Sequence, residues 1–215
     1  DKDIEIYGRI GNGFRFPNID DRIGGSGGTS LELKTQETNE FEIGSNYKTT
    51  TFSSSISGYL IDGKNELAYD TDAFQNININ STRRFGVELK IKNRLLDNLT
   101  LTNNFTFSKA KYTSGDQGTY ATDFNGNDVP LVPQYSMDSI LDWQLSDLTK
   151  ITSIIKYQDD MRMESDDENF QETKIPSYVI GNLSITSDFK KFFSTVSINN
   201  IFDKKYHNYA VASSG

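Results

Sequence analysis

The triplet Phe14, Arg15 and Phe16 is the first candidate for ligand chemistry, because it sets a guanidinium between two aromatic rings. A cation next to π faces can bind an anionic, aromatic ligand through charge and stacking. The same residues also suit an anchor that packs a loop against a protein wall. Since glycines precede the triplet and Pro17 follows it, we predict that a strand leaves its sheet here and enters a loop.

A second candidate group lies in the polar segment Ser114–Gln134, which carries aromatic and amide side chains. Such side chains can stack on a ligand and hydrogen-bond to it. Position in a long loop is the only ground for this hypothesis. The residues of this group are Tyr120, Phe124, Asn125 and Asn127.

Metal and enzyme chemistry have little support. The acidic segment Asp159–Glu168 could gather Ca²⁺, but it lacks the spacing of a calcium loop and is predicted to be hydrated and mobile. The chain has no cysteine, and no nucleophile or carboxylate is specified as a partner for its one histidine, His207. Gly24–Gly28 lacks the Lys and Ser/Thr of a phosphate loop. We therefore predict no enzyme, no metal site and no cofactor.

Strands must position these candidates, and the hairpin Thr82–Thr113 shows their pattern most clearly. In its first arm Phe85, Val87, Leu89 and Ile91 alternate with polar or small residues, and the second arm behaves in the same way. A strand converts this period of two into one apolar and one polar face. The arms are long and the turn is short, which is typical of transmembrane β-strands of about 9 to 11 residues.

The same alternation continues along the chain. Further strands are predicted over Ile4–Ile10, Glu37–Lys48, Phe52–Ile61, Tyr135–Leu145, Ile151–Tyr157, Ser177–Ser187 and Phe192–Ile201. Long connections are predicted over Gly11–Gln36, Asp62–Ser81, Ser114–Gln134 and Asp159–Pro176. Because long connections and short turns alternate, all long loops fall on one rim of a meander and all short turns on the other.

Composition agrees with a sheet that is apolar on one side only. The chain has 215 residues, of which 35% are hydrophobic, and a mean hydropathy of −0.58, which is poor for a packed soluble core. No apolar run is long enough for a membrane helix, which needs about 18 residues. The net charge of −8 argues against nucleic acid as a partner, since phosphate binding needs a basic surface.

We therefore predict an all-β fold, a segment of an antiparallel up-and-down transmembrane β-barrel with about nine strands. Apolar side chains would touch lipid and polar ones a wet lumen. Aromatic residues near strand ends would form interfacial girdles, or simply reflect strand propensity: Tyr47, Phe52, Tyr112, Tyr135, Tyr157 and Phe192. An odd number of strands with open edges does not close a bacterial barrel, so we expect a fragment.

Five segments resemble motifs of TonB-dependent outer-membrane receptors, in the order and spacing of that family. They are Gly11–Asp21 (GNGFRFPNIDD), Leu31–Gly44 (LELKTQETNEFEIG), Thr82–Ile91 (TRRFGVELKI), Val129–Tyr135 (VPLVPQY) and Asn199–Ala210 (NNIFDKKYHNYA). Each motif is weak alone, but five of them in the family's order and spacing across nearly the whole chain are specific. The sequence departs from the family where Thr35 or Gln36 stands for a proline and Ile201 for a leucine.

The resemblance implies that residues 1–215 are the C-terminal portion of a barrel of about 22 strands, with the plug domain, the TonB box and the final strand outside the chain. It implies a receptor in the outer membrane that takes up a scarce extracellular ligand, most often a ferric siderophore, with energy from the TonB complex. Outer-membrane lipid and lipopolysaccharide would be partners. Lys204 and Lys205 could meet lipopolysaccharide phosphate at the outer rim, or they could form only a solvated charge cluster. The alternatives are a smaller outer-membrane barrel acting as an enzyme or adhesin, and a soluble extracellular β-protein.

Overall fold

The computed structural model describes residues 3–23, 32–70, 74–79, 81–113 and 124–212. Its elements are β1 (Asp3–Arg15), α1 (Ile19–Ile23), β2 (Gln36–Lys48), β3 (Phe52–Lys64), β4 (Glu66–Asp70), β5 (Gln75–Ile79), β6 (Thr82–Leu96), β7 (Leu99–Tyr112), β8 (Tyr135–Ser146), β9 (Thr149–Gln158), β10 (Tyr178–Asp188) and β11 (Phe193–Ile198). Among the described residues, no helix has the length and apolar character needed to cross a membrane.

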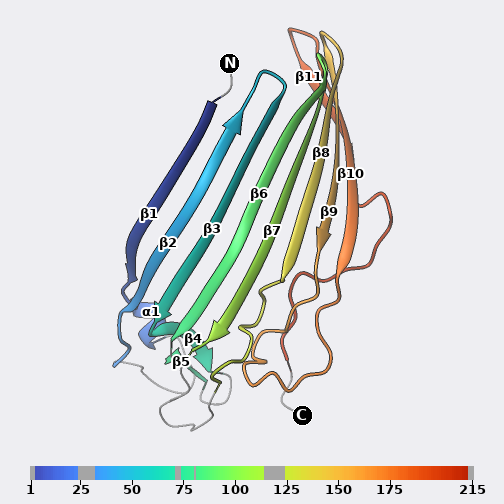
Figure 1. Cartoon of the computed structure of the whole chain (residues 1–215). Helices are drawn as coiled ribbons and strands as arrows, with labels where there is room; N and C mark the ends of the chain where they lie inside the picture. The colour runs from blue at the N-terminus through green and yellow to red at the C-terminus, as the bar shows by residue number, and fades with distance from the viewer. Residues whose placement is uncertain (1–2, 24–31, 71–73, 80, 114–123, 213–215) are drawn as a thin grey trace.

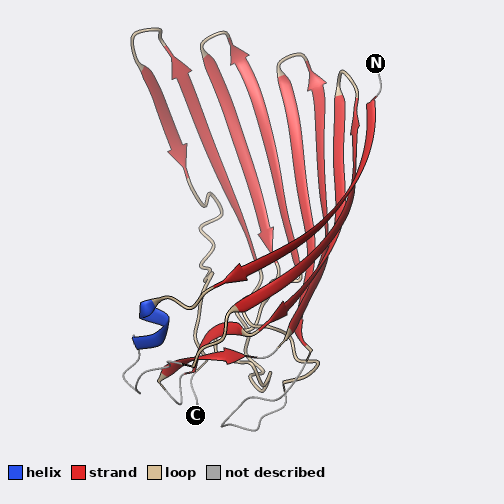
Figure 2. Ribbon diagram, turned by 90° about the vertical axis from the view of Figure 1, so that its left-hand side faces the viewer, coloured by secondary structure: helices blue, strands red, loops and turns tan. Residues whose placement is uncertain are grey.

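Nine of the strands form a single antiparallel sheet in the order β1-β2-β3-β6-β7-β8-β9-β10-β11, and β4 pairs with β5 in a separate hairpin. Figure 1 shows the short turns of this meander together at its upper end and the long connections together at its lower end. The side view in Figure 2 shows that the sheet is curved like part of a cylinder. The predicted all-β meander with two unlike rims is confirmed.

One face of the sheet is apolar because the register aligns apolar positions of neighbouring strands. Ile10 is opposite Phe41, Phe41 is opposite Leu60, and Leu60 is opposite Phe85. These side chains do not pack on a second layer, since Ile10 is 76%, Phe41 47% and Phe85 39% exposed. The described residues thus form a one-layer wall and not a sandwich with a dry core.

The other face is polar, and tyrosines cover two of its glycines. Tyr7 lies opposite Gly44, and Tyr59 lies opposite Gly86. A Cβ added to Gly44 would lie 2.5 Å from Cζ of Tyr7, and one added to Gly86 would lie 2.7 Å from Cζ of Tyr59. Each ring therefore occupies the space that a side chain on the next strand would need, which shields a bare strand backbone.

Two predicted strand ends are wrong. The first strand runs to Arg15 and not to Ile10, because the glycine-rich residues after Ile10 keep pairing with β2 until Arg15 meets Gln36. The last strand ends at Ile198 and not at Ile201. Beyond it, Asn200 has a φ of 52° and its backbone N–H donates to Asn182 Oδ1 at 2.8 Å, so the chain turns away from the ladder.

The predicted loop Asp62–Ser81 is also wrong in part. β3 continues to Lys64, and the hairpin of β4 and β5 follows at once. Asn78 joins this hairpin to the connection before β2: its Oδ1 accepts from the Lys34 N–H at 2.6 Å and its Nδ2 donates to the Lys34 carbonyl at 3.1 Å. The lower rim in Figure 1 is therefore partly ordered by regular structure.

Candidate functional site

The rim of long connections carries the candidate ligand residues, and Arg15 is the first of them. Its Nη2 lies 3.0 Å from Asp21 Oδ1 in α1, and the arginine side chain is 52% exposed. Asn18 fixes Asp21, because the Asn18 N–H donates to Asp21 Oδ2 at 2.9 Å and the Asp21 N–H donates to Asn18 Oδ1 at 2.7 Å. Arg15 thus anchors the segment after β1 while half of its side chain stays open to solvent.

Phe14 and Phe16 pack against each other and not on the two sides of Arg15. Their ring centroids are 5.1 Å apart in an edge-to-face arrangement, and they are 71% and 68% exposed. Phe14 belongs to the alternating set that includes Ile10, so it extends the apolar face. The three residues therefore offer a separate cation and aromatic pair, and their contact with a ligand stays a prediction.

The described part of the second group forms a tight turn beside the end of β7. The Phe124 ring lies 5.6 Å from the Tyr112 ring, and the Asn127 N–H donates to the Phe124 carbonyl at 2.9 Å. Gly126 has a φ of +86°, which a glycine adopts without strain. Asn125 is exposed at the tip.

Tyr120, the remaining member of this group, lies outside the described residues. The ligand role of the second group therefore also stays a prediction.

Hydrogen bonds lock this turn to the connection between β9 and β10. Asn127 Nδ2 donates to the Asp167 carbonyl at 2.9 Å, and the Tyr112 hydroxyl donates to the Asp167 carboxylate. Asn169 pairs with the backbone of Asp128 in both directions, at 2.8 and 2.9 Å. Tyr112 was predicted as a girdle aromatic, which is wrong because it is 2% exposed and bonds to Asp167. Asn169 was not identified from the sequence. The partners of both residues are about 40 to 55 residues away along the chain and share no spacing rule.

The acidic connection is less hydrated than was predicted, whereas its mobility stays a prediction. Asp166 is only 3% exposed, and its Oδ2 lies 2.8 Å from Arg162 Nη1. Asp160 pairs with Lys174 at 2.9 Å. The carboxylates are therefore used to fold the loop. In the described part of the chain, no three His, Cys, Asp or Glu side chains are placed to hold a metal ion.

Burial raises the pKa of the Asp167 carboxyl above its ordinary value of 3.8. The ionised form is therefore disfavoured in the folded loop, and stability that is present below pH 3.8 is lost as the pH rises through the raised pKa. Asp167→Asn removes the charge and keeps an acceptor for Tyr112. We expect the variant loop to resist protease better than wild type at neutral pH, with no difference below pH 3.8, in limited proteolysis of the full-length protein. Faster cleavage of the variant at neutral pH would contradict this.

A buried ion pair joins the β4–β5 hairpin to the wall. Arg84 donates from Nη1 and Nη2 to both Glu66 oxygens, each at 2.7 Å, and the Thr82 hydroxyl donates to the same carboxylate. Glu66 is 7% and Thr82 is 1% exposed. Gly63 leaves room for Glu66, because a Cβ there would overlap the carboxylate. The hairpin is thereby held at the rim.

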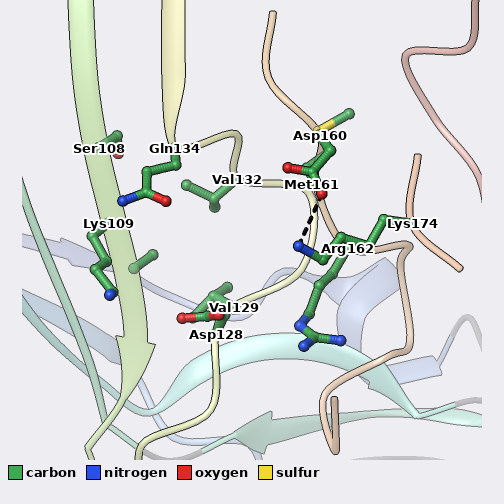
Figure 3. Close-up of a pocket in the computed structure, with 11 residues that line it drawn as sticks. Ser108, Lys109, Asp128, Val129, Val132, Gln134, Asp160, Met161, Arg162 and Lys174 are labelled. Atoms are coloured by element: carbon green, nitrogen blue, oxygen red, sulfur yellow. Dashed lines mark ion pairs between the residues drawn. The ribbon is translucent and has the colours of Figure 1, made fainter. Parts of the chain in front are cut away.

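A small cavity of about 90 Å³ lies where β7 extends past the start of β8 (Figure 3). Its lining residues come from β7 and the two connections that follow β7 and β9: Ser108, Lys109, Ala110, Asp128, Val129, Val132, Gln134, Asp160, Met161, Arg162 and Lys174. Ligand pockets for organic molecules measure about 300 to 1,000 Å³. This cavity is therefore suited to water and not to an organic ligand.

The segment after β11 returns to the same rim. The Glu164 N–H donates to the Ala210 carbonyl at 2.9 Å, and the Tyr209 hydroxyl donates to the Glu164 carboxylate. His207 is exposed in this segment, as are Lys204 and Lys205. The arrangement presents no catalytic constellation around His207 among the described residues.

The comparisons with known proteins give a family and a fold. The family model described as TonB dependent receptor-like, beta-barrel matches residues 1–201. No curated protein matches the sequence. The ferric yersiniabactin uptake receptor FyuA from Yersinia pestis superposes with a TM-score of 0.73 at 17% identity, over 99% of this chain and 32% of that one.

Other solved receptors superpose in the same way. The siderophore receptor PiuA from Acinetobacter baumannii has a TM-score of 0.72 at 19% identity, over 98% of this chain and 31% of that one. The ferric enterobactin receptor PfeA from Pseudomonas aeruginosa has a TM-score of 0.70 at 19% identity, over 94% of this chain and 33% of that one. The chain thus spans about a third of the length of these receptors. With the family match over residues 1–201, it belongs to the β-barrel family of the TonB-dependent receptors.

Proposed function

We propose that this chain is part of the barrel wall and mouth of an outer-membrane receptor that takes up a ferric siderophore with energy from the TonB complex. In this proposal residues 1–215 are a C-terminal portion of the barrel, and a plug domain encoded upstream fills its lumen. The apolar face touches membrane lipid and the polar face lines the lumen. The rim of long connections faces the outside, where ligand arrives.

The proposal rests on two contrasts within one curved sheet. One face is apolar and the other polar, and one rim carries long connections while the other carries short turns. A wall that exposes Ile10 at 76% and Phe41 at 47% needs an apolar solvent on that side. Long, interlocked connections on one rim suit ligand capture, since outer-membrane barrels carry their long loops outside. FyuA is a ferric yersiniabactin uptake receptor, PiuA is a siderophore receptor and PfeA is a ferric enterobactin receptor, which supports this cargo class.

Arg15 is the residue for which we propose direct contact with the cargo. Its guanidinium is half-exposed at the ligand-facing rim, and its pairing with Asp21 is at the surface, where an exposed ion pair contributes about 0 to 1 kcal/mol. An anionic ligand can therefore compete for it at low cost. We propose Phe14, Phe16, Tyr120, Phe124, Asn125 and Asn127 as further ligand contacts.

Deletion of the full-length gene tests the function. We expect the deletion strain to lose iron-limited growth on one ferric siderophore and to keep growth on free iron salts. Complementation with Arg15→Ala should raise the half-saturating ligand concentration about tenfold, because a hydrogen bond to a charged group contributes about 1.5 to 3 kcal/mol. The measurement is uptake of the radiolabelled iron complex by whole cells.

Arg94→Ala is the matched control for uptake. Arg94 is also a half-exposed arginine in an ion pair, with Asp97, but it lies at the rim of short turns. Its replacement should leave uptake unchanged. Equal growth of wild type and deletion strain on every ferric siderophore tested would refute the cargo class, and a growth defect on cobalamin alone would reassign it.

A further inference from the structure

Three lysines lie on the polar face of the wall, towards the rim of short turns at the upper end of Figure 1. Lys48 ends β2, and Lys90 and Lys92 lie in the second half of β6. Each lies an even number of residues from Gly44 or Gly86 along its own strand, so it shares their face. All three residues are exposed, and together they are called the lysine cluster.

Two serines of β3 lie between these lysines. Ser53 is directly opposite Lys48 on one side and Lys92 on the other, and Ser55 is opposite Lys90 and an asparagine of β2. The four positions that face the two serines are therefore three lysines and one amide. Neighbouring strands are about 4.8 Å apart, so the flexible lysine side chains can bring their ammonium groups together above the small serines.

No carboxylate pairs with the lysine cluster in the part of the chain that the structure describes. Glu5 accepts instead from Asn46, at 3.0 Å. Asp142 interacts electrostatically with Lys92, but it is already bonded by Lys150 at 2.6 Å. The nearby acids that have partners are thus engaged elsewhere.

Two further acids on this face border the cluster without closing it. Asp3 is opposite Lys48, and Glu88 is opposite Ser57, so neither faces Ser53 or Ser55 across the ladder. Neither acid forms an ion pair with a described residue. The space above the two serines is therefore surrounded by positive charge.

This arrangement suits an oxygen anion. Unpaired cations that lie close together repel one another, and an anion between them removes the repulsion. Ammonium groups and serine hydroxyls can all donate hydrogen bonds, and a carboxylate or phenolate oxygen accepts several of them. The anionic ligand proposed to meet Arg15 has the charge that the lysine cluster needs, so one ligand can satisfy both.

We propose that the lysine cluster is a second binding site for the anionic cargo, which the cargo reaches after it has left the mouth. This rests on the proposed function, which makes the polar face the lumen and the rim of short turns the periplasmic end. Arg15 ends β1 at the rim of long connections, whereas Lys48 ends β2 at the opposite rim. The two sites therefore act in sequence, the first in capture and the second in transfer along the wall.

Ser53→Asp and Ser53→Asn in the full-length receptor give the sharpest test, because the two new side chains have the same shape. The aspartate places a carboxylate between Lys48 and Lys92 and so occupies the cluster, whereas the asparagine leaves it free. We expect Ser53→Asp to take up radiolabelled ferric siderophore about tenfold more slowly at saturating ligand, and Ser53→Asn to match wild type. Binding to cells treated with a protonophore, which reports capture at the mouth, should be equal in both.

Charge removal provides a second, independent variant. Replacing all three lysines of the cluster by glutamine should slow uptake as Ser53→Asp does, and replacing them by arginine should preserve it. Lys191→Gln is the matched control, because Lys191 is also exposed at the rim of short turns but lies in the turn between β10 and β11. Immunoblots of outer-membrane fractions check that the variants are present in equal amounts.

Several results would overturn the proposal. Equal loss of uptake in Ser53→Asp and Ser53→Asn would show a packing effect, and entry of vancomycin into cells with Ser53→Asp would show that the lysines hold an acidic segment of the plug. Absence of both binding and uptake in wild type would refute the proposed function. Normal binding and uptake in wild type, Ser53→Asp and the glutamine variant would refute the second site alone.

Discussion

Arg84→Ala is expected to free the β4–β5 hairpin from the wall at a cost of about 3 kcal/mol, because it leaves the Glu66 carboxylate buried without its partner. Glu66 is 7% exposed and receives both guanidinium donors at 2.7 Å. The Arg84 side chain is itself 30% exposed, so we take the lower end of the range measured for broken buried pairs. Hydrogen exchange of residues 64–79 in the full-length protein measures the release, as faster exchange in the hairpin amides.

Arg83→Ala is the matched control for this prediction. Arg83 is the preceding residue on β6 and also pairs with a carboxylate, Asp62, at 2.7 Å, but its side chain is 53% and that of Asp62 33% exposed. Its loss should cost less than about 1 kcal/mol, as exposed pairs do. The hypothesis fails if both variants exchange alike, or if Glu66→Gln in the Arg84→Ala background does not restore protection.

The alternation of residue types was enough to predict the wall. In β6, Phe85 and Val87 alternate with Arg84 and Gly86, and the structure puts the two sets on opposite faces as expected. Alternation depends only on neighbouring residues in the sequence. Because the sheet is one layer thick, no packing against a second layer can change which face each side chain occupies. The order of long and short connections then fixes the meander, since each strand pairs with its neighbour in the main sheet.

Strand ends were harder to predict, because pairing and not composition decides them. The glycines after Ile10 suggested a loop, yet β1 continues to Arg15 where β2 offers partners. Glycine lacks a side chain to pack but still has both backbone hydrogen-bonding groups. At the other end, Asn200 leaves the ladder by bonding to Asn182, which no pattern of apolar residues indicates.

The location of the candidate site at the rim of long connections could be predicted, but the contacts of its residues could not. The rim and the residues on it followed from the meander, but their partners did not: Arg15 is held by Asp21, and Asn127 by the backbone of Asp167. These contacts depend on how separate connections meet in space. The hydration predicted for the acidic loop was wrong for the same reason, because Arg162, which pairs with Asp166, was not recognised as its internal counterion.

Gly86→Val is expected to have the largest effect on assembly of the barrel, because its Cβ would overlap the Phe107 carbonyl and lie 2.7 Å from Tyr59 Cζ. The carbonyl belongs to the strand ladder and cannot move freely, and the ring is held by a 3.2 Å hydrogen bond from the Tyr59 hydroxyl to Ser108. Overpacking of this kind costs about 1 to 3 kcal/mol, and displacing a ladder carbonyl adds to it, so we expect little folded receptor in the outer membrane.

Gly58→Val is the matched control: it makes the same substitution one residue before Tyr59 on the open face, where the change in stability should be within about 0.5 kcal/mol. Immunoblots of outer-membrane fractions compare the two, and similar amounts of both variants would show that tyrosine over glycine does not constrain the wall.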